Sequence, residues 1–168
     1  GQKNILRPFI RDAGINIIYD IYIEGWSDVN AAHEMDKLLR FFDGEIDVII
    51  SSNDRMASGT AQILKEYGKS GNVLLTGQDA DIKACRRILS GEQAMTIYKP
   101  IKDLAYATAD LAVNIAKSDK SIQFDESINN GRADIPALLL EPVVVTKDNI
   151  ENTVIADGFY NREELFGE

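Results

Sequence analysis

Short apolar runs alternate with longer stretches of helical spacing along the first hundred residues. Runs rich in β-branched and aromatic residues, without helical periodicity, predict strands that are covered on both faces. These runs are residues 15–23, 46–50, 73–76 and 94–98. The stretches between them carry apolar residues at helical spacing, and two of them end at a glycine. Helices are therefore expected at residues 29–42, 57–67 and 81–89.

The alternating order of strands and helices predicts an α/β fold. Strand–helix–strand units cross over right-handed, which gives a parallel sheet with helices on both faces. Such a sheet holds its ligand in a crevice at the carboxyl ends of the strands. Pro100 suits the start of a further helix at 101–117. Residues 118–135 are polar and rich in turn formers, which predicts an ordered loop before the β-rich residues 138–146.

Charge and rare residue types narrow the range of functions. The 168 residues carry a net charge of −9, whereas a protein that neutralises phosphates needs clustered Lys and Arg, so we expect no nucleic-acid partner. Cys85 is the single cysteine and is expected to be a small core residue. A catalytic thiol would need His33, which lies on a separate predicted helix. The sequence thus favours neither disulfides nor thiol catalysis.

Targeting signals are not evident in the sequence. No run approaches the roughly 18 consecutive apolar residues of a membrane span. Residues 1–20 lack the charged-then-apolar pattern of a signal peptide. We therefore expect the chain to be a mature form, a truncated form, or both.

Polar and aromatic side chains follow the predicted strands at their carboxyl ends. The four candidates for ligand binding are Trp26, Asn53, Asp79 and Lys99. An indole offers a flat apolar face to the C–H surface of a sugar ring, and the polar groups match hydroxyls that both donate and accept. This edge of the sheet therefore predicts a site for a small polyhydroxylated molecule.

Each of these positions also has a purely structural explanation. Asp54 and Asp81 precede predicted helices, so we expect them to act as N-caps rather than as ligands. Asn53 is equally compatible with shaping a turn, Trp26 with a partly buried surface anchor, and Lys99 with a solvated charge. Only the convergence of the four candidates on one edge favours binding.

Catalytic motifs are absent from the sequence. It contains no dinucleotide-binding glycine motif, no P-loop and no nucleophile elbow. Acidic pairs such as Asp79 and Asp81 do not define a glycosidase without a measured separation of their carboxyl groups. One histidine and one cysteine also give no support to a metal site. We expect a protein that is not an enzyme and that needs no cofactor.

Several segments resemble those of the periplasmic D-xylose-binding proteins, which are type I sugar-binding proteins, and they occur in the same order. The segments are Gly25–Trp26, Ser51–Asp54, Gly77–Asp81, Met95–Pro100, Asn129–Gly131, Asp148–Ile150 and Val154–Phe159. The resemblance covers almost the whole chain and implies that it is the C-terminal half of such a protein. Arg55 and Met56 depart from the smaller residues expected at their positions.

The resemblance also assigns roles and lobes. It implies that Trp26 stacks on the sugar, while Asn53, Asp79 and Lys99 form hydrogen bonds with its hydroxyls. Residues 1–98 are then the C-terminal sugar-binding lobe. Residues 99–135 are a hinge crossing and a segment of the N-terminal lobe, and residues 136–168 cross back and form a tail. Since the family's N-terminal half is not in this sequence, we expect binding to need that lobe.

The function implied by the resemblance is recognition of a pentose, D-xylose, through hinge closure of two lobes. The protein is expected outside the cytoplasm, in the periplasm or as a cell-surface lipoprotein of a single-membrane bacterium. Its partner is expected to be an ABC permease or a membrane sensor histidine kinase, and we favour the permease. The alternative is the effector-binding core of a lactose-repressor-like transcription regulator, which shares this fold but needs a DNA-binding headpiece.

Overall fold

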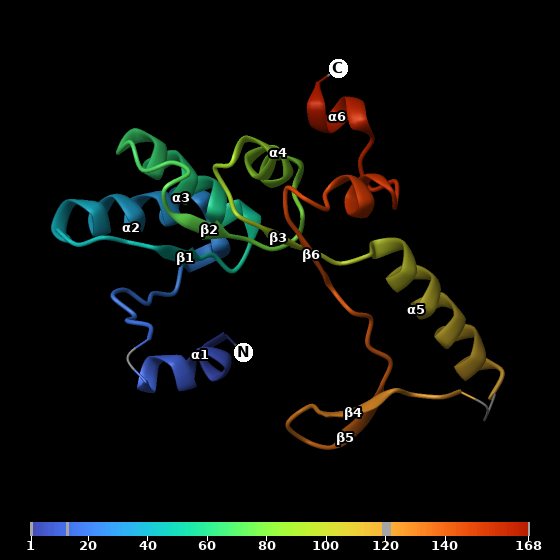
Figure 1. Cartoon of the computed structure of the whole chain (residues 1–168). Helices are drawn as coiled ribbons and strands as arrows, with labels where there is room; N and C mark the ends of the chain where they lie inside the picture. The colour runs from blue at the N-terminus through green and yellow to red at the C-terminus, as the bar shows by residue number, and fades with distance from the viewer. Residues whose placement is uncertain (1, 13, 119–121, 168) are drawn as a thin grey trace.

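In the computed structural model, residues 2–12, 14–118 and 122–167 are described, and helices alternate with strands over most of this length (Figure 1). The first part contains α1 (Gln2–Arg11), η1 (Glu24–Trp26), α2 (Asp28–Phe41), β1 (Val48–Ile50), α3 (Asp54–Glu66), β2 (Leu74–Thr76), α4 (Ile82–Ser90) and β3 (Thr96–Tyr98). The second part contains α5 (Ile101–Ala116), β4 (Glu126–Asn129), β5 (Asp134–Ala137), β6 (Val143–Val145), η2 (Glu151–Ile155) and α6 (Arg162–Phe166).

The central sheet is mainly parallel. β1 and β2 pair in parallel, with Ile49 opposite Leu75. A parallel bridge between Thr76 and Met95 places β3 beside β2, and β6 then pairs antiparallel with β3. The strand order is therefore β1, β2, β3, β6. Three parallel strands joined by helices confirm the α/β fold predicted from the sequence.

α2 and α3 form one layer over β1 and β2 (Figure 1). Their contact is built on Met35 of α2 and on Ile63 and Leu64 of α3, which are all buried, and Ile49 packs against this cluster from β1. A side chain at Gly59 would overlap the backbone of Asp28, so the two helices lie in close contact near their N-termini.

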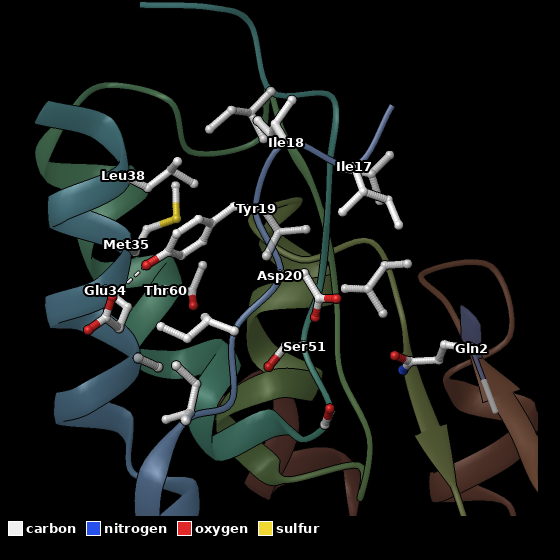
Figure 2. A pocket seen from close by; sticks show the side chains of 18 of the residues that line it. Gln2, Ile17, Ile18, Tyr19, Asp20, Glu34, Met35, Leu38, Ser51 and Thr60 are labelled. Atoms are coloured by element: carbon white, nitrogen blue, oxygen red, sulfur yellow. Dashed lines mark hydrogen bonds between the residues drawn. The ribbon is translucent and has the colours of Figure 1, made fainter. Parts of the chain in front are cut away.

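Residues 15–23 do not form the strand that their composition predicts. No strand of the described structure includes them, and they lead into the 3-10 turn η1. Figure 2 shows Ile17 to Asp20 on a trace that faces α2, where Tyr19 donates a hydrogen bond of 2.6 Å to Glu34. A strand needs a partner edge as well as a suitable composition, and the described residues provide none here.

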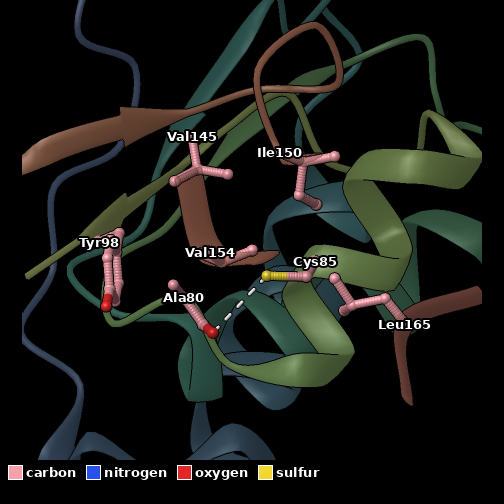
Figure 3. Close-up of a cluster of buried hydrophobic side chains, with 7 residues drawn as sticks. All are labelled: Ala80, Cys85, Tyr98, Val145, Ile150, Val154 and Leu165. Carbon is pink, nitrogen blue, oxygen red and sulfur yellow. Dashed lines mark hydrogen bonds between the residues drawn. The ribbon is translucent and has the colours of Figure 1, made fainter. Parts of the chain in front are cut away.

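A second core lies between α4 and the C-terminal segment (Figure 3). Tyr98 of β3 and Val145 of β6 meet Val154 and Leu165 there, all of them buried. Cys85 is fully buried in this cluster, which confirms the prediction of a core residue. Burial raises the pKa of the Cys85 thiol to about 12.

Residues 118–135 contain more regular structure than the predicted loop. β4 and β5 form an antiparallel hairpin with Ile128 opposite Ile135, while residues 119–121 lie outside the described residues. The turn begins at Asn129, whose side chain accepts a 2.9 Å hydrogen bond from the backbone of Gly131 at φ +87°. The turn chemistry was recognised, but the short polar strands on either side were not.

α5 and the hairpin extend away from the sheet (Figure 1). None of the described residues of α5 is buried, and its apolar side chains include Leu104 at 52% and Ile115 at 60% exposure. Among the described residues, no helix is both long and apolar enough to cross a bilayer.

Candidate functional site

The carboxyl ends of β1, β2 and β3 meet at one edge of the sheet and are joined there by backbone hydrogen bonds. The Asp54 N–H donates to Gln78 O at 2.8 Å, which links the loops after β1 and β2. The Asp79 N–H donates to Ile97 O at 2.8 Å, which links the loop after β2 to β3. This edge holds three of the four predicted ligand residues on connected loops.

Asp79 and Lys99 form an ion pair across this edge. Lys99 Nζ lies 2.6 Å from Asp79 Oδ1, and the two side chains are 51% and 38% exposed. A carboxylate accepts hydrogen bonds from hydroxyl groups, and an ammonium donates to hydroxyl oxygens. The pair therefore presents both kinds of polar group to a small ligand, and each partner keeps the other in place.

The loop that carries Asp79 is strained. Asp79 has φ +104° and Ala80 has φ +54°. Residues other than glycine rarely adopt backbone conformations with positive φ. Thr96 of β3 stabilises this conformation, because its Oγ1 accepts a 3.2 Å hydrogen bond from the Ala80 N–H. Strained backbone of this kind concentrates at binding and catalytic sites, where the surrounding structure enforces it.

Asn53 caps α3. Its Oδ1 accepts a 2.9 Å hydrogen bond from the backbone of Met56, and its carbonyl accepts another from the Ser51 hydroxyl. The N-cap role predicted for Asp54 therefore belongs to Asn53, one residue earlier. Because the cap uses Oδ1, the Nδ2 amide is the group of Asn53 that is suited to donate to a ligand.

Trp26 stands at the end of η1, directly before the Ser27 cap of α2. Gly25 and Trp26 both have positive φ, at +65° and +51°, and the Trp26 side chain is 47% exposed. Within the described residues, Trp26 makes no hydrogen bond with the other three candidates. An ion pair of 3.4 Å between Arg55 and Asp28 links the starts of α3 and α2, so Trp26 and Asn53 precede neighbouring helix ends.

Asp54 is the best connected side chain of this edge, and it is fully buried. Its Oδ1 accepts from Gln93 Nε2 at 3.0 Å, and its Oδ2 accepts from the Thr96 hydroxyl at 2.7 Å. The same Oδ2 also accepts from the backbone N–H of Asp81 at 2.9 Å. One carboxylate thus fixes the loops that follow β1 and β2 to the residues around the start of β3.

The neighbours of Asp54 are fitted closely around it. Burial raises the pKa of the Asp54 carboxyl, against the effect of the three donors, which lower it. A Cβ at Gly77 would overlap Asp54 Oδ1, so only glycine leaves room for the carboxylate. Arg87 donates to the backbone carbonyl of Asp54, and Gln93 donates to its Oδ1. Arg87 and Gln93 are also hydrogen-bonded to each other at 3.0 Å.

Asp81 occupies the N-cap position of α4, but its side chain makes no capping hydrogen bond, so the predicted side-chain role is wrong. Its side chain is exposed. Over residues 2–12, 14–118 and 122–167, no three His, Cys, Asp or Glu side chains are grouped in a way that would hold a metal ion.

One cavity lies outside the Asp79–Lys99 edge. It has a volume of about 760 Å³ and lies between residues 14–23 and β1, with mostly apolar walls (Figure 2). Trp26 and Ser51 line one part of it, whereas Asp79 and Lys99 do not. The Asp79–Lys99 pair therefore lies outside this apolar cavity, whereas Trp26 borders it.

Comparison with known proteins agrees with the observed fold. The family model described as a periplasmic binding protein domain matches residues 1–120. The chain belongs to this family.

Two relatives of this periplasmic binding protein domain are D-xylose-binding periplasmic proteins. The protein of Haemophilus influenzae is 40% identical over 166 residues, which are 99% of this chain and 50% of the relative. The protein of Escherichia coli strain K12 is 40% identical over 165 residues, with 98% and 50% covered. The chain thus spans about half the length of the curated relatives it matches.

A solved structure of a solute binding protein also matches this chain. An ABC transporter solute binding protein from Clostridium phytofermentans, with bound β-D-glucose, has a TM-score of 0.80 and 25% identity. The match covers 97% of this chain and 53% of that chain. These relatives are binding proteins and not enzymes, which agrees with the absence of catalytic motifs from the sequence.

In this periplasmic binding protein domain, the residues that sequence reasoning missed are those that hold the loops rather than those that face outward. Gln93, Thr96 and Arg87 all bond to Asp54, and none of them follows a strand at its carboxyl end. The one sequence signal for this arrangement was Gly77. The reason for a glycine at this position is clear only once the Asp54 carboxylate is seen beside it.

Proposed function

We propose that this domain is the C-terminal half of a two-lobed extracytoplasmic protein that binds a pentose, D-xylose, and delivers it to an ABC permease. The observation that carries the proposal is the 2.6 Å pair at the carboxyl edge of the sheet between Asp79, which lies on a strained loop, and Lys99, which follows β3. The names of the relatives from Haemophilus influenzae and Escherichia coli support the sugar and the periplasmic location.

The proposed contacts follow from the group that each side chain has available. Asp79 accepts from sugar hydroxyls, while Lys99 and the Asn53 Nδ2 group donate to hydroxyl oxygens. The half-exposed indole of Trp26 covers one face of the ring. A hydroxyl group is best satisfied when it both donates and accepts, and Asp79 and Lys99 lie close enough to serve a single hydroxyl.

The second lobe is proposed from the exposure of α5. This helix carries apolar side chains such as Ile101 and Leu104, which are 55% and 52% exposed. An apolar helix without a packing partner is costly in water, so we assign residues 99–135 to the complementary lobe. Residues 136–168 then return to the first lobe, where β6 pairs with β3. Closure of the two lobes on the sugar produces the state that the permease recognises.

The choice of sugar and of partner rests on the relatives. The Clostridium phytofermentans protein is named as an ABC transporter solute binding protein, and this favours delivery to a permease over reading by a sensor histidine kinase. The periplasmic relatives also favour this proposal over the core of a lactose-repressor-like regulator. Since that structure contains glucose, D-glucose is the informative competitor for D-xylose.

Isothermal titration of the full-length protein tests the proposal. D-xylose and D-glucose differ only in the hydroxymethyl group, so selective binding of xylose isolates the pentose claim. We expect glucose to bind at least about tenfold more weakly, as for a pocket that excludes one extra carbon group. Equal binding of both sugars would reduce the claim to a general sugar-binding protein, and binding of neither would refute it.

Asp79→Asn with Asp81→Asn as its matched control tests the site. Both changes remove one carboxylate from the same loop, but only Asp79 is paired with Lys99. Loss of a charge-assisted hydrogen bond of about 1.5–3 kcal/mol should weaken D-xylose binding by about 10- to 150-fold in Asp79→Asn. Asp81→Asn should bind like the wild type. Equal effects of both changes would contradict a direct role for Asp79.

A further inference from the structure

Asp157, which follows η2, is bonded to both ends of the short segment that joins β3 to α5. The Tyr98 hydroxyl, at the end of β3, donates a hydrogen bond to Asp157 Oδ2. The Lys102 ammonium, in the first turn of α5, donates to the Asp157 backbone carbonyl at 2.6 Å. Within the described residues, this is the one hydrogen bond from a side chain of α5 to a residue outside the helix. Tyr98, Asp157 and Lys102 thus form a clamp around the start of α5.

The clamp encloses Lys99, a proposed sugar ligand. Lys99 lies between the two clamped residues, and its ammonium is 2.6 Å from Asp79 Oδ1. Pro100 comes next with φ −61°, an angle that its ring restricts. The Lys99 ammonium ends a flexible four-carbon stem, so its reach depends on where the backbone places that stem. By holding both sides of the segment, the clamp determines where the Lys99 side chain starts.

Asp157 is itself held in place by its neighbours. Its N–H donates to the Thr153 carbonyl at 2.9 Å. Val154 is fully buried in the same core as Tyr98 (Figure 3). The Phe159 ring lies 5.0 Å from the Tyr98 ring, within the range of a favourable aromatic pair. Asp157 is therefore a fixed point, against which the end of β3 and the start of α5 are held.

Both bonds of the clamp are fitted into their surroundings. Burial, together with the bond to Asp157, raises the pKa of the Tyr98 phenol, so the hydroxyl keeps its proton and remains a donor. Gly158 has φ +66°, and a Cβ at this position would lie 3.2 Å from Lys102 Nζ. Glycine accepts this backbone conformation and leaves room for the ammonium beside the carbonyl. A buried donor and a closely fitted glycine distinguish the clamp from an isolated contact between surface side chains.

We propose that Lys102 and Asp157 are positioning residues for sugar binding, which act through Lys99. They hold the backbone on both sides of Lys99, so that its ammonium is already ordered when it meets the sugar hydroxyls. The proposal rests on the function proposed above, since Lys99 is a ligand only in that function. Ordering a long side chain on binding lowers affinity, so loss of the clamp should weaken sugar binding only while Lys99 is present.

Isothermal titration of D-xylose into the full-length protein tests the role of Lys102. Lys102→Met should weaken binding about three- to tenfold, as expected when one long side chain must be ordered on binding. Lys102→Arg keeps a donor for the Asp157 carbonyl and should bind like the wild type. Lys117→Met is the matched control, because it removes the same charge from the exposed C-terminal end of α5. Equal losses in Lys102→Met and Lys117→Met would overturn the proposal.

A Lys99→Met background shows whether Lys102 acts through Lys99. In this background, Lys102→Met should cause no further loss of affinity, which NMR titration measures even when binding is weak. A merely structural role of Lys102 would weaken binding by the same factor in both backgrounds, and this result would refute the proposal.

Backbone amide relaxation, measured by NMR on the sugar-free full-length protein, tests the ordering without the ligand. The order parameter of the Lys99 N–H should be about 0.85 in the wild type, typical of rigid backbone, and below about 0.6 in Lys102→Met. Asp157→Ala should lower it too, whereas Asp157→Asn keeps an oxygen for the Tyr98 hydroxyl and should restore it. An unchanged order parameter in both Lys102→Met and Asp157→Ala, with intact xylose binding by the wild type, would refute the positioning alone. A lowered order parameter in a protein whose wild type binds no sugar would refute only the proposed function.

Discussion

Replacing Asp54 with asparagine tests whether one buried carboxylate holds the proposed binding edge together. Asparagine has the same shape, but one oxygen becomes an NH₂ group. At Oδ2 this group would face the backbone N–H of Asp81 and the Thr96 hydroxyl, and at Oδ1 it would face Gln93 Nε2. Gln93 cannot turn without losing the 3.0 Å bond that Arg87 donates to its Oε1. The amide therefore opposes two donors in one orientation and one donor in the other.

The size of the effect follows from these contacts. A hydrogen bond to a charged group contributes about 1.5–3 kcal/mol, and the variant loses at least one of three. Removing the buried charge offsets part of the loss, because burial disfavours the ionised form and raises the pKa of Asp54. We expect Asp54→Asn to lower the free energy of unfolding by about 2 kcal/mol, which corresponds to a fall in Tm of about 5 °C for a chain of this size.

Urea unfolding monitored by circular dichroism measures this difference, with Asp81→Asn as the control. Both variants lose one acidic group from the ligand edge, but the Asp81 side chain is exposed and makes no capping bond. Asp81→Asn should unfold within about 0.5 kcal/mol of the wild type. If Asp54→Asn is as stable as Asp81→Asn, the three donors do not depend on the carboxylate and the reasoning is wrong.

Three further outcomes follow from the same edge and its core. Gly77→Ala should lose about 1–3 kcal/mol of stability by calorimetry, because its Cβ would overlap Asp54 Oδ1; a variant of wild-type Tm would contradict that packing. Asp79→Gly should unfold at a higher temperature than Asp79→Asn, because glycine accepts φ +104° and relieves strain of about 1–3 kcal/mol. Neither variant should bind D-xylose tightly. Cys85, with a pKa of about 12 and full burial, should react with a thiol reagent at pH 8 only after denaturant is added, and rapid labelling of the native protein would show that α4 opens.

The elements predicted best from the sequence are those whose signals are local. α4 ends as its glycine signal indicates, since Gly91 adopts φ +82° directly after Ser90. The helix predicted at 29–42 is observed at Asp28–Phe41, where apolar spacing and the Ser27 cap agree. Residues 15–23 show the limit of such reasoning. Their composition favours a strand, but strand formation depends on a partner edge that lies elsewhere in the molecule.

In the candidate site, too, local signals predicted some features, and the others depend on distant residues. The sequence placed Asn53 and Asp54 together after a strand, but the prediction that Asp54 caps α3 is wrong, because Asn53 caps the helix and Asp54 is buried. That difference depends on Thr96 and Gln93, which are 42 and 39 residues away from Asp54 along the chain. Local rules therefore identified the edge, and only the contacts between loops assigned the roles within it.

Those contacts separate the residues that give the edge its shape from the residues that we propose to bind the sugar. The Asp54 carboxylate is fully buried and is occupied by three donors from the protein, so it has no exposed surface to offer a sugar. Asp79 and Lys99 are partly exposed and have each other as partner. A ligand that replaces this pairing meets groups whose positions are already fixed, because Asp54 holds the loop around them. Rigidity of this kind lowers the entropy lost on binding, and it explains why the strain at Asp79 is tolerated in the unbound domain.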